Sequence, residues 1–288
     1  MSQNLTSKPA SQVHHFTLGS FTGVVINDGQ LEFPPTIAAP TASPQELDRA
    51  LIEIGLVPGK PLILDMNFLV VNTSEHVVLI DSGAGNILAG LQAAGIDPTS
   101  IDTVVLSHAH PDLIGGLLDQ NGQPRFSHAR HVLPRVEWEF WSSEPKLGEL
   151  LVPDDQREWL RSAPHSVFPA IRDCLDLIEF GQEIVPGITT VAAVGHTPGQ
   201  VAIEVSSDGK RLLYMADAMT HAELQFSHIE WVGPVDNWPA HSILTRRQLL
   251  NSAAKPDTLA MAAHFTFPGI GRVTSDSQTS GWHWAPIQ

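Results

Sequence analysis

The sequence has a single cysteine among 288 residues, and it has only 16 Lys and Arg against 31 Asp and Glu. With Cys174 alone, no disulfide can form within the chain, so the fold does not depend on an oxidising compartment. Cys174 lies in the segment Ile171-Arg-Asp-Cys-Leu-Asp-Leu-Ile178, where we expect it to be a small apolar core residue rather than a nucleophile. The net charge of -15 argues against a nucleic-acid partner, because phosphate binding rests on clustered Lys and Arg. It also argues against binding to an anionic membrane.

Long apolar runs are missing as well. No uninterrupted run approaches the roughly 20 residues of a membrane-spanning helix, and the first residues carry no apolar stretch of the signal-peptide type. A hydrophobic content of 42% with 16% charged residues is typical of a globular protein. We therefore expect a cytoplasmic protein whose partner is a small-molecule substrate, with no nucleic acid or membrane involved. A homodimer is left open.

The sequence predicts one domain with two peripheral segments. We expect residues 1–12 to form a mobile tail and residues 13–288 to form a single domain with an insertion at about 33–61. The insertion is rich in Pro and Ala, and within it Ser43-Pro44-Gln45-Glu46 predicts the start of a helix. Ser43 would be the N-cap and Glu46 would complete a capping box, while Gly55 would end the helix. This segment could lean over a cleft.

Short apolar runs and helix-start signals predict the remaining elements. Strands are expected at 21–25, 67–72, 76–80, 103–106, 131–134, 188–194, 201–205, 211–215 and 258–262. Helices are expected at 86–94, 136–141, 168–180 and 239–254. Two blocks of strands, each followed by helices, predict an α/β fold in which two sheets pack face to face with helices outside.

The strongest functional signal follows the strand expected at 103–106. His108 and His110 lie two residues apart, and side chains with this spacing in an extended segment point the same way. Two imidazoles on one side of a turn can bind one cation, and Asp112 adds a carboxylate within reach. Gly115 and Gly116 permit close backbone approach behind the loop. The pattern predicts one half of a metal site.

Three further candidate ligands stand at the ends of later strands. His196 follows the strand at 188–194, Asp217 follows the strand at 211–215, and His264 follows the strand at 258–262. Each could be an ordinary satisfied polar residue when considered alone. Functional groups are commonly held on rigid elements, however, and their repeated placement at strand ends predicts that they join the first loop in one metal centre.

These residues resemble the metallo-β-lactamase superfamily motif, His-x-His-x-Asp-His followed by separate His, Asp and His ligands. The segments 195–199, 215–221 and 262–271 are similar to the methyl parathion hydrolase branch of that superfamily. The resemblance covers roughly residues 60–288. It implies an αβ/βα sandwich of two packed mixed sheets, with metal ions at one edge.

The resemblance also implies two sets of ligands. One site would use His108, His110 and His196, and the other would use Asp112 and His264, with Asp217 shared between them. The sequence departs from the family at Leu113, where a histidine ligand is usual. We therefore expect one tightly bound Zn²⁺ and a weaker second ion, with Mn²⁺ or Fe²⁺ as alternatives at the carboxylate-rich second site.

Two positions near the expected centre stay open. His221 lies about one helical turn beyond Asp217, so it could replace the missing ligand or support a ligand through a hydrogen bond. Leu113 and, by the resemblance, Trp141 are expected to border the substrate pocket.

The expected chemistry is hydrolysis by a metal-bound hydroxide, because Zn²⁺ lowers the pKa of bound water to about 7. We expect Asp112 and Asp217 to be the catalytic carboxylates, and Asp112 could act as a general base. One divalent ion against two carboxylates leaves a neutral site, which favours an uncharged ester, lactone or phosphotriester. The alternatives are a single-iron oxidoreductase on the same fold and a ligand-binding relative without catalysis.

Overall fold

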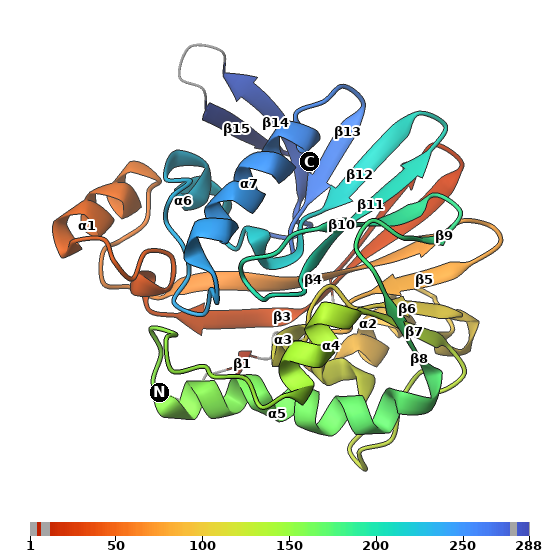
Figure 1. Ribbon diagram of the computed structural model, residues 1–288. Helices are drawn as coiled ribbons and strands as arrows, with labels where there is room; N and C mark the ends of the chain where they lie inside the picture. The colour runs from red at the N-terminus through yellow and green to blue at the C-terminus, as the bar shows by residue number, and fades with distance from the viewer. Residues whose placement is uncertain (1–4, 7–11, 277–280, 288) are drawn as a thin grey trace.

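Two long strands, β3 (Phe21–Phe33) and β4 (Leu62–Asn72), form the centre of the first sheet in the computed structural model, which describes residues 5–6, 12–276 and 281–287 (Figure 1). Both strands are buried along most of their length. Strands covered on both faces have near-continuous apolar runs rather than strict alternation. Val24–Ile26 and Phe68–Val71 are such runs, and they anchor the main hydrophobic core.

The first sheet has eight strands among the described residues, with β1, β3, β4, β5, β6, β7 and β8 side by side and β2 paired to β3. The strands from β5 to β8 run parallel, and the others are antiparallel. The remaining bounds are β1 (Leu5–Thr6), β2 (Val13–Leu18), β5 (Val77–Ile80), β6 (Thr103–Val105), β7 (Arg130–Pro134) and β8 (Leu175–Ile178).

The second sheet has seven strands in the described part of the chain, in the order β15 to β9. Its one parallel pair there is β12 with β13. The bounds are β9 (Glu183–Val185), β10 (Ile188–Ala192), β11 (Val201–Ser207), β12 (Lys210–Tyr214), β13 (Thr258–Met261), β14 (Ile270–Asp276) and β15 (Gly281–Pro286).

Helices cover the outer faces of the sheets. Figure 1 shows α2 to α5 gathered on one side of the molecule and α1, α6 and α7 on the other. The α-helices are α1 (Pro44–Glu53), α2 (Ile87–Ala93), α3 (Pro111–Ile114), α4 (Arg135–Ser142), α5 (Asp154–Ile171), α6 (Ala222–Ser227) and α7 (Pro239–Ala253). The short 3-10 turns are η1 (Pro35–Ile37), η2 (Pro98–Ser100), η3 (Gly115–Leu117), η4 (Arg172–Cys174) and η5 (Ala216–Ala218). The predicted fold of two packed mixed sheets with helices outside is confirmed.

The predicted helix at 168–180 is wrong. The chain leaves α5 at Ile171 and pairs as β8 with β7, with His131 opposite Leu175. Pro164 and Pro169 each remove an amide donor, which disfavours the interior of a helix. Helix α5 nevertheless passes through both, and its buried apolar face packs into the core. Tertiary packing and strand pairing therefore outweigh the local pattern here.

The two segments predicted to be peripheral differ in how they are placed. The expected tail at 1–12 falls largely on residues outside the described ones, and Leu5–Thr6 within it pair with β3. In the segment 33–61, α1 begins with the predicted capping box: Glu46 N lies 3.3 Å from Ser43 Oγ, and Ser43 N lies 2.9 Å from Glu46 Oε2. Helix α1 buries Leu47, Ala50 and Leu51 in a small apolar cluster.

None of the described helices has the length and hydrophobicity of a membrane-spanning segment.

The only tyrosine of the chain connects the two sheets. At the end of β12, Tyr214 donates its hydroxyl hydrogen to Asp81 Oδ2, which lies 2.8 Å away just after β5. Ser107 N donates to the other oxygen of Asp81 at 2.8 Å. Burial raises the pKa of Asp81 to about 7, although both hydrogen bonds favour the ionised form. Because this pKa lies above the value of 3.8 for a free Asp, Asp81 lowers the stability of the folded state as pH rises from about 4 to about 7, and it causes no further loss above that.

We predict that Tyr214→Phe, which keeps the ring, lowers the free energy of unfolding by about 1–3 kcal/mol at pH 8, since a buried acceptor loses its donor. The loss should be smaller at pH 5, where Asp81 carries a proton in the folded state. Urea denaturation of the metal-free protein at both pH values measures the effect. An unchanged midpoint at pH 8 would contradict the proposed connection between the sheets.

Candidate metal centre

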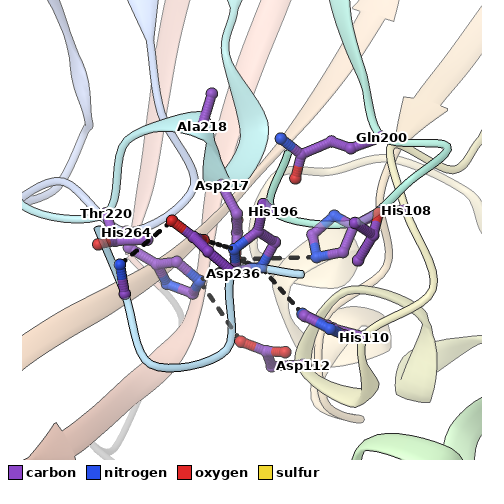
Figure 2. Close-up of polar contacts among 12 residues, drawn as sticks. His108, His110, Asp112, His196, Gln200, Asp217, Ala218, Thr220, Asp236 and His264 are labelled. Carbon is purple, nitrogen blue, oxygen red and sulfur yellow. Dashed lines mark hydrogen bonds and ion pairs between the residues drawn. The ribbon is translucent and has the colours of Figure 1, made fainter. Parts of the chain in front are cut away.

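The six predicted ligands lie together at the ends of strands from both sheets. His108 and His110 follow β6, and Asp112 lies in the first turn of α3. His196 follows β10, Asp217 lies in η5 after β12, and His264 follows β13. All six are buried. Figure 2 shows their side chains converging around Asp217.

The first group consists of three imidazoles and one carboxylate. His108, His110, His196 and Asp217 each offer one donor atom, and these atoms lie within 4.8 Å of one another. His196 Nε2 lies 3.0 Å from His110 Nδ1 and 3.5 Å from Asp217 Oδ2. Burial lowers the pKa of His108 to about 3. The imidazole is therefore neutral, which is the form that binds a metal ion.

The second group consists of Asp112, Asp217 and His264. His264 Nε2 lies 3.1 Å from Asp217 Oδ2 and 3.4 Å from Asp112 Oδ2. Burial lowers the pKa of His264, but the two carboxylates outweigh it and raise the pKa well above its usual value. Without an ion, a proton on His264 balances the negative charge. A second metal ion would have to replace this proton, because ligands bind in their deprotonated form.

The donor atoms fit a divalent ion. His108 Nε2 and Asp217 Oδ1 are buried and have no hydrogen-bond partner. Buried polar atoms are rarely left unpaired, and binding of an ion is one accepted reason for an exception. Three histidine nitrogens and a shared carboxylate match the tetrahedral coordination of Zn²⁺. The residues present can therefore hold one ion in the first group, and Asp112 and His264 are two further donors for a second ion that would share Asp217.

A loop before α7 supports His196, and the sequence analysis missed it. Asp236 Oδ1 accepts a hydrogen bond from His196 Nδ1 at 2.7 Å, which leaves Nε2 facing the centre. Asn237 donates to His196 O from its backbone N at 3.0 Å and from Nδ2 at 2.9 Å. The guanidinium of Arg246 lies 3.6 Å from Asp236 Oδ2. A carboxylate behind a ligand histidine fixes its ring orientation and its tautomer.

His264 is supported from the opposite sheet. Its Nδ1 lies 2.9 Å from Asp65 O in β4. Asp65 Oδ2 also accepts a hydrogen bond from Phe267 N at 3.0 Å, and Asn67 Nδ2 donates to Phe265 O at 2.6 Å. Strand β4 thus holds the loop after β13, although no sequence pattern connects the two segments. The one feature of the sequence that could have indicated this contact is the presence of two polar residues, Asp65 and Asn67, within an otherwise apolar strand.

Leu113 lies in the core behind the metal loop. It is fully buried, and its carbonyl accepts hydrogen bonds from Ser82 N at 2.7 Å and Ser82 Oγ at 3.0 Å. The expected close approach at Gly116 is confirmed, because a Cβ there would lie 2.0 Å from Ser82 O. Leu113 therefore packs the loop against β5 and does not line the cavity, in contrast to the expectation.

Trp141 and His221 also differ from their expected places. Trp141 is buried, donates from Nε1 to Glu137 Oε1 at 2.8 Å, and packs edge-on to His110 with 5.7 Å between ring centroids. It lies behind a ligand rather than on the cavity wall. His221 belongs to neither metal group and instead caps α6, where its Nδ1 accepts from Leu224 N at 3.5 Å.

A cavity opens directly over the centre. His110, Asp112, His196, Asp217 and His264 lie at its base. Its walls are mostly apolar side chains from the 33–64 segment, α5 and the loop before α7: Phe33, Ile37, Leu64, Trp159, Leu160, Pro234 and Val235. A small molecule with an apolar part can therefore reach the metal centre.

Residues 66–264 match the sequence profile of the metallo-β-lactamase superfamily, and they include all six residues of the centre. The chain belongs to the metallo-β-lactamase superfamily. The predicted superfamily is thus confirmed. With this fold and this centre, the protein is a metal-dependent hydrolase that uses a divalent metal ion and acts on a small-molecule substrate.

Similar proteins include lactonases. An N-acyl homoserine lactonase of Bacillus sp is 25% identical over 197 residues, which are 58% of this chain and 69% of the relative. One of Bacillus cereus is 23% identical over 208 residues, or 62% and 74% of the two chains. Among solved structures, AidC, a dizinc quorum-quenching lactonase with a bound product, is 25% identical with a TM-score of 0.89 over 98% of this chain and 99% of its own.

We predict that Leu113→His leaves the affinity for the second ion unchanged and lowers the melting temperature, because the side chain at this position packs in the core and not towards the centre. A buried imidazole without a partner costs about 1–3 kcal/mol. Calorimetric titration of the metal-free protein with zinc and a melting curve measure both effects, and Leu113→Met is the apolar control. Second-ion binding at least about tenfold tighter with retained stability would show instead that position 113 faces the second group.

Proposed function

We propose that this superfamily member hydrolyses the ester bond of uncharged lactones, with N-acyl homoserine lactones as the substrate class. The observation that carries the proposal is a two-group metal centre at the base of an apolar cavity. The similar Bacillus proteins are N-acyl homoserine lactonases, and AidC is a lactonase.

Charge in the cavity favours an uncharged substrate. Asp112 and Asp217 together balance the charge of one divalent ion. Asp236 and Arg246, which also line the cavity, offset each other. A neutral site gains little from binding an anion, because the Coulomb attraction depends on the charges of both partners. A phosphate monoester is therefore disfavoured, whereas a lactone fits.

The cavity walls favour a substrate with an apolar chain. Gln156, Trp159 and Leu160 line the cavity from one face of α5, since residues three and four apart share a helix face. Phe33 and Leu64 line it from the segment that includes the insertion. Each buried methylene of an acyl chain contributes about 0.8 kcal/mol, so these walls provide affinity for the acyl part.

The chain's own residues position the reactants. A divalent ion in the first group would polarise the ester carbonyl and activate water. Asp112 lies at the cavity base, where its carboxylate can take a proton from the attacking water and return it to the ring oxygen as the C–O bond breaks. The product is one hydroxy acid, because the leaving alcohol stays attached to the acyl part.

We further propose that Zn²⁺ fills the first group tightly and the second group more weakly, since the first has four donors and the second has three, with Asp217 shared. Mn²⁺ or Fe²⁺ can take the carboxylate-rich second group. The resemblance of residues 195–199 and 215–221 to methyl parathion hydrolases makes a phosphotriester the second candidate substrate. The homodimer and the cytoplasmic location stay predictions.

The substrate class is tested with zinc-loaded protein and four compounds: N-hexanoyl homoserine lactone, an alkyl lactone without an amide, a phosphotriester and a phosphomonoester. We expect the highest kcat/KM for the N-acyl lactone and the lowest for the phosphomonoester. Asp217→Ala should lower the N-acyl lactone value by far more than tenfold, which is about 1.4 kcal/mol of barrier. Asp173→Ala, at an exposed position in η4, is the control.

Two results would count against the proposal. Hydrolysis of the phosphotriester ahead of both lactones would favour the second candidate. Retention of activity within tenfold in Asp217→Ala would remove Asp217 from the centre.

A further inference from the structure

Glu137, in the first turn of α4, is a fully buried carboxylate with four hydrogen-bond donors around it. Its Oε1 accepts from Ala109 N at 3.0 Å and from Trp141 Nε1 at 2.8 Å. Its Oε2 accepts from Thr197 Oγ1 at 2.8 Å and from Gly199 N at 2.9 Å. All four donors are neutral groups, so hydrogen bonds rather than an ion pair stabilise the carboxylate.

The donors come from the two loops that carry the first metal group. Ala109 is the residue between the two histidines of the β6 loop, and Thr197 directly follows His196. One oxygen of Glu137 binds the first loop, and the other oxygen binds the second. The two loops are about 86 residues apart in sequence, as the contact between His110 and His196 shows. A single side chain therefore joins them.

Close packing of Gly199 against α4 also holds Glu137 next to the loop that carries His196. A Cβ on Gly199 would lie 2.2 Å from Glu137 N and 2.5 Å from Glu137 Cβ. A larger residue at 199 would push the β10 loop away from α4. The short distance shows that α4 and this loop are in direct backbone contact, so Glu137 has little freedom to move relative to His196.

The second metal group is supported elsewhere. His264 is oriented by Asp65 O in β4, and the four donors to Glu137 include neither of the residues that belong to the second group alone. A change at Glu137 should therefore act on the three imidazoles of the first group before it acts on the second group.

We propose that Glu137 is a positioning residue that holds both histidine loops of the first metal group as one unit and thereby sets the affinity for the first ion. Preorganised ligands bind a metal more tightly because less freedom is lost on binding. The proposal concerns metal loading, so it does not depend on which ester the enzyme hydrolyses.

The first test compares Glu137→Gln with Glu139→Gln, an identical change at an exposed position of the same helix. Glutamine keeps one acceptor oxygen but presents an amide donor to the donors of one loop. We expect the first zinc ion to bind about 10- to 100-fold more weakly in Glu137→Gln and unchanged in Glu139→Gln. Competition with a chromophoric chelator measures the affinity, and circular dichroism checks the fold. Unchanged affinity in folded Glu137→Gln overturns the proposal.

A milder pair of variants keeps the test decisive if Glu137→Gln does not fold. Thr197→Val is nearly isosteric but lacks the hydroxyl donor, whereas Thr197→Ser keeps the donor and loses a methyl group. We expect Val to weaken binding of the first zinc ion and Ser to preserve it. Equal zinc affinities in the two variants would mean that the bond to Glu137 serves stability alone and would overturn the proposal.

Discussion

The structure depends on one electrostatic constraint, which is that Asp217 is buried among four imidazoles at the meeting point of two sheets. Burial raises the pKa of this carboxylate, but the charge and hydrogen bond of His264, together with the charge of His196, outweigh burial and lower the pKa. With His108 neutral and three buried atoms of the cluster, His108 Nε2, His110 Nε2 and Asp217 Oδ1, without a hydrogen-bond partner, the cluster is complete only when a cation is bound. Such an arrangement is costly for a protein that has no metal to bind, because unpaired buried groups destabilise the fold.

Each sheet contributes half of the centre and also holds the other half in place. The first sheet supplies the β6 loop, and its strand β4 orients His264 through Asp65 O. The second sheet supplies the other ligands, and Tyr214 at the end of β12 reaches Asp81, which in turn binds the backbone just before His108. The candidate metal centre therefore lies at an interface between two sheets, where the positions of its residues are set by the packing of both.

The sequence predicts the ligands far better than their supports. His108, His196 and His264 follow apolar strands, so local patterns reveal them, and the structure brings them together. Asp236 and Glu137 act on loops 28 to 60 residues away in sequence, and no local pattern encodes such a contact. In the sequence, Glu137 is one polar residue in a helix rich in aromatic residues, and nothing there distinguishes it from an exposed glutamate. Trp141, which was expected to border the pocket, is instead buried, because its indole donates a hydrogen bond to Glu137.

Anomalous X-ray diffraction at the zinc edge, on crystals grown with one equivalent of zinc and with an excess, tests the account most directly. The account predicts one strong peak among His108, His110, His196 and Asp217 at one equivalent. With excess zinc, a second peak should appear among Asp112, Asp217 and His264. Equal peaks at both positions with one equivalent, or a peak away from Asp217, would contradict it.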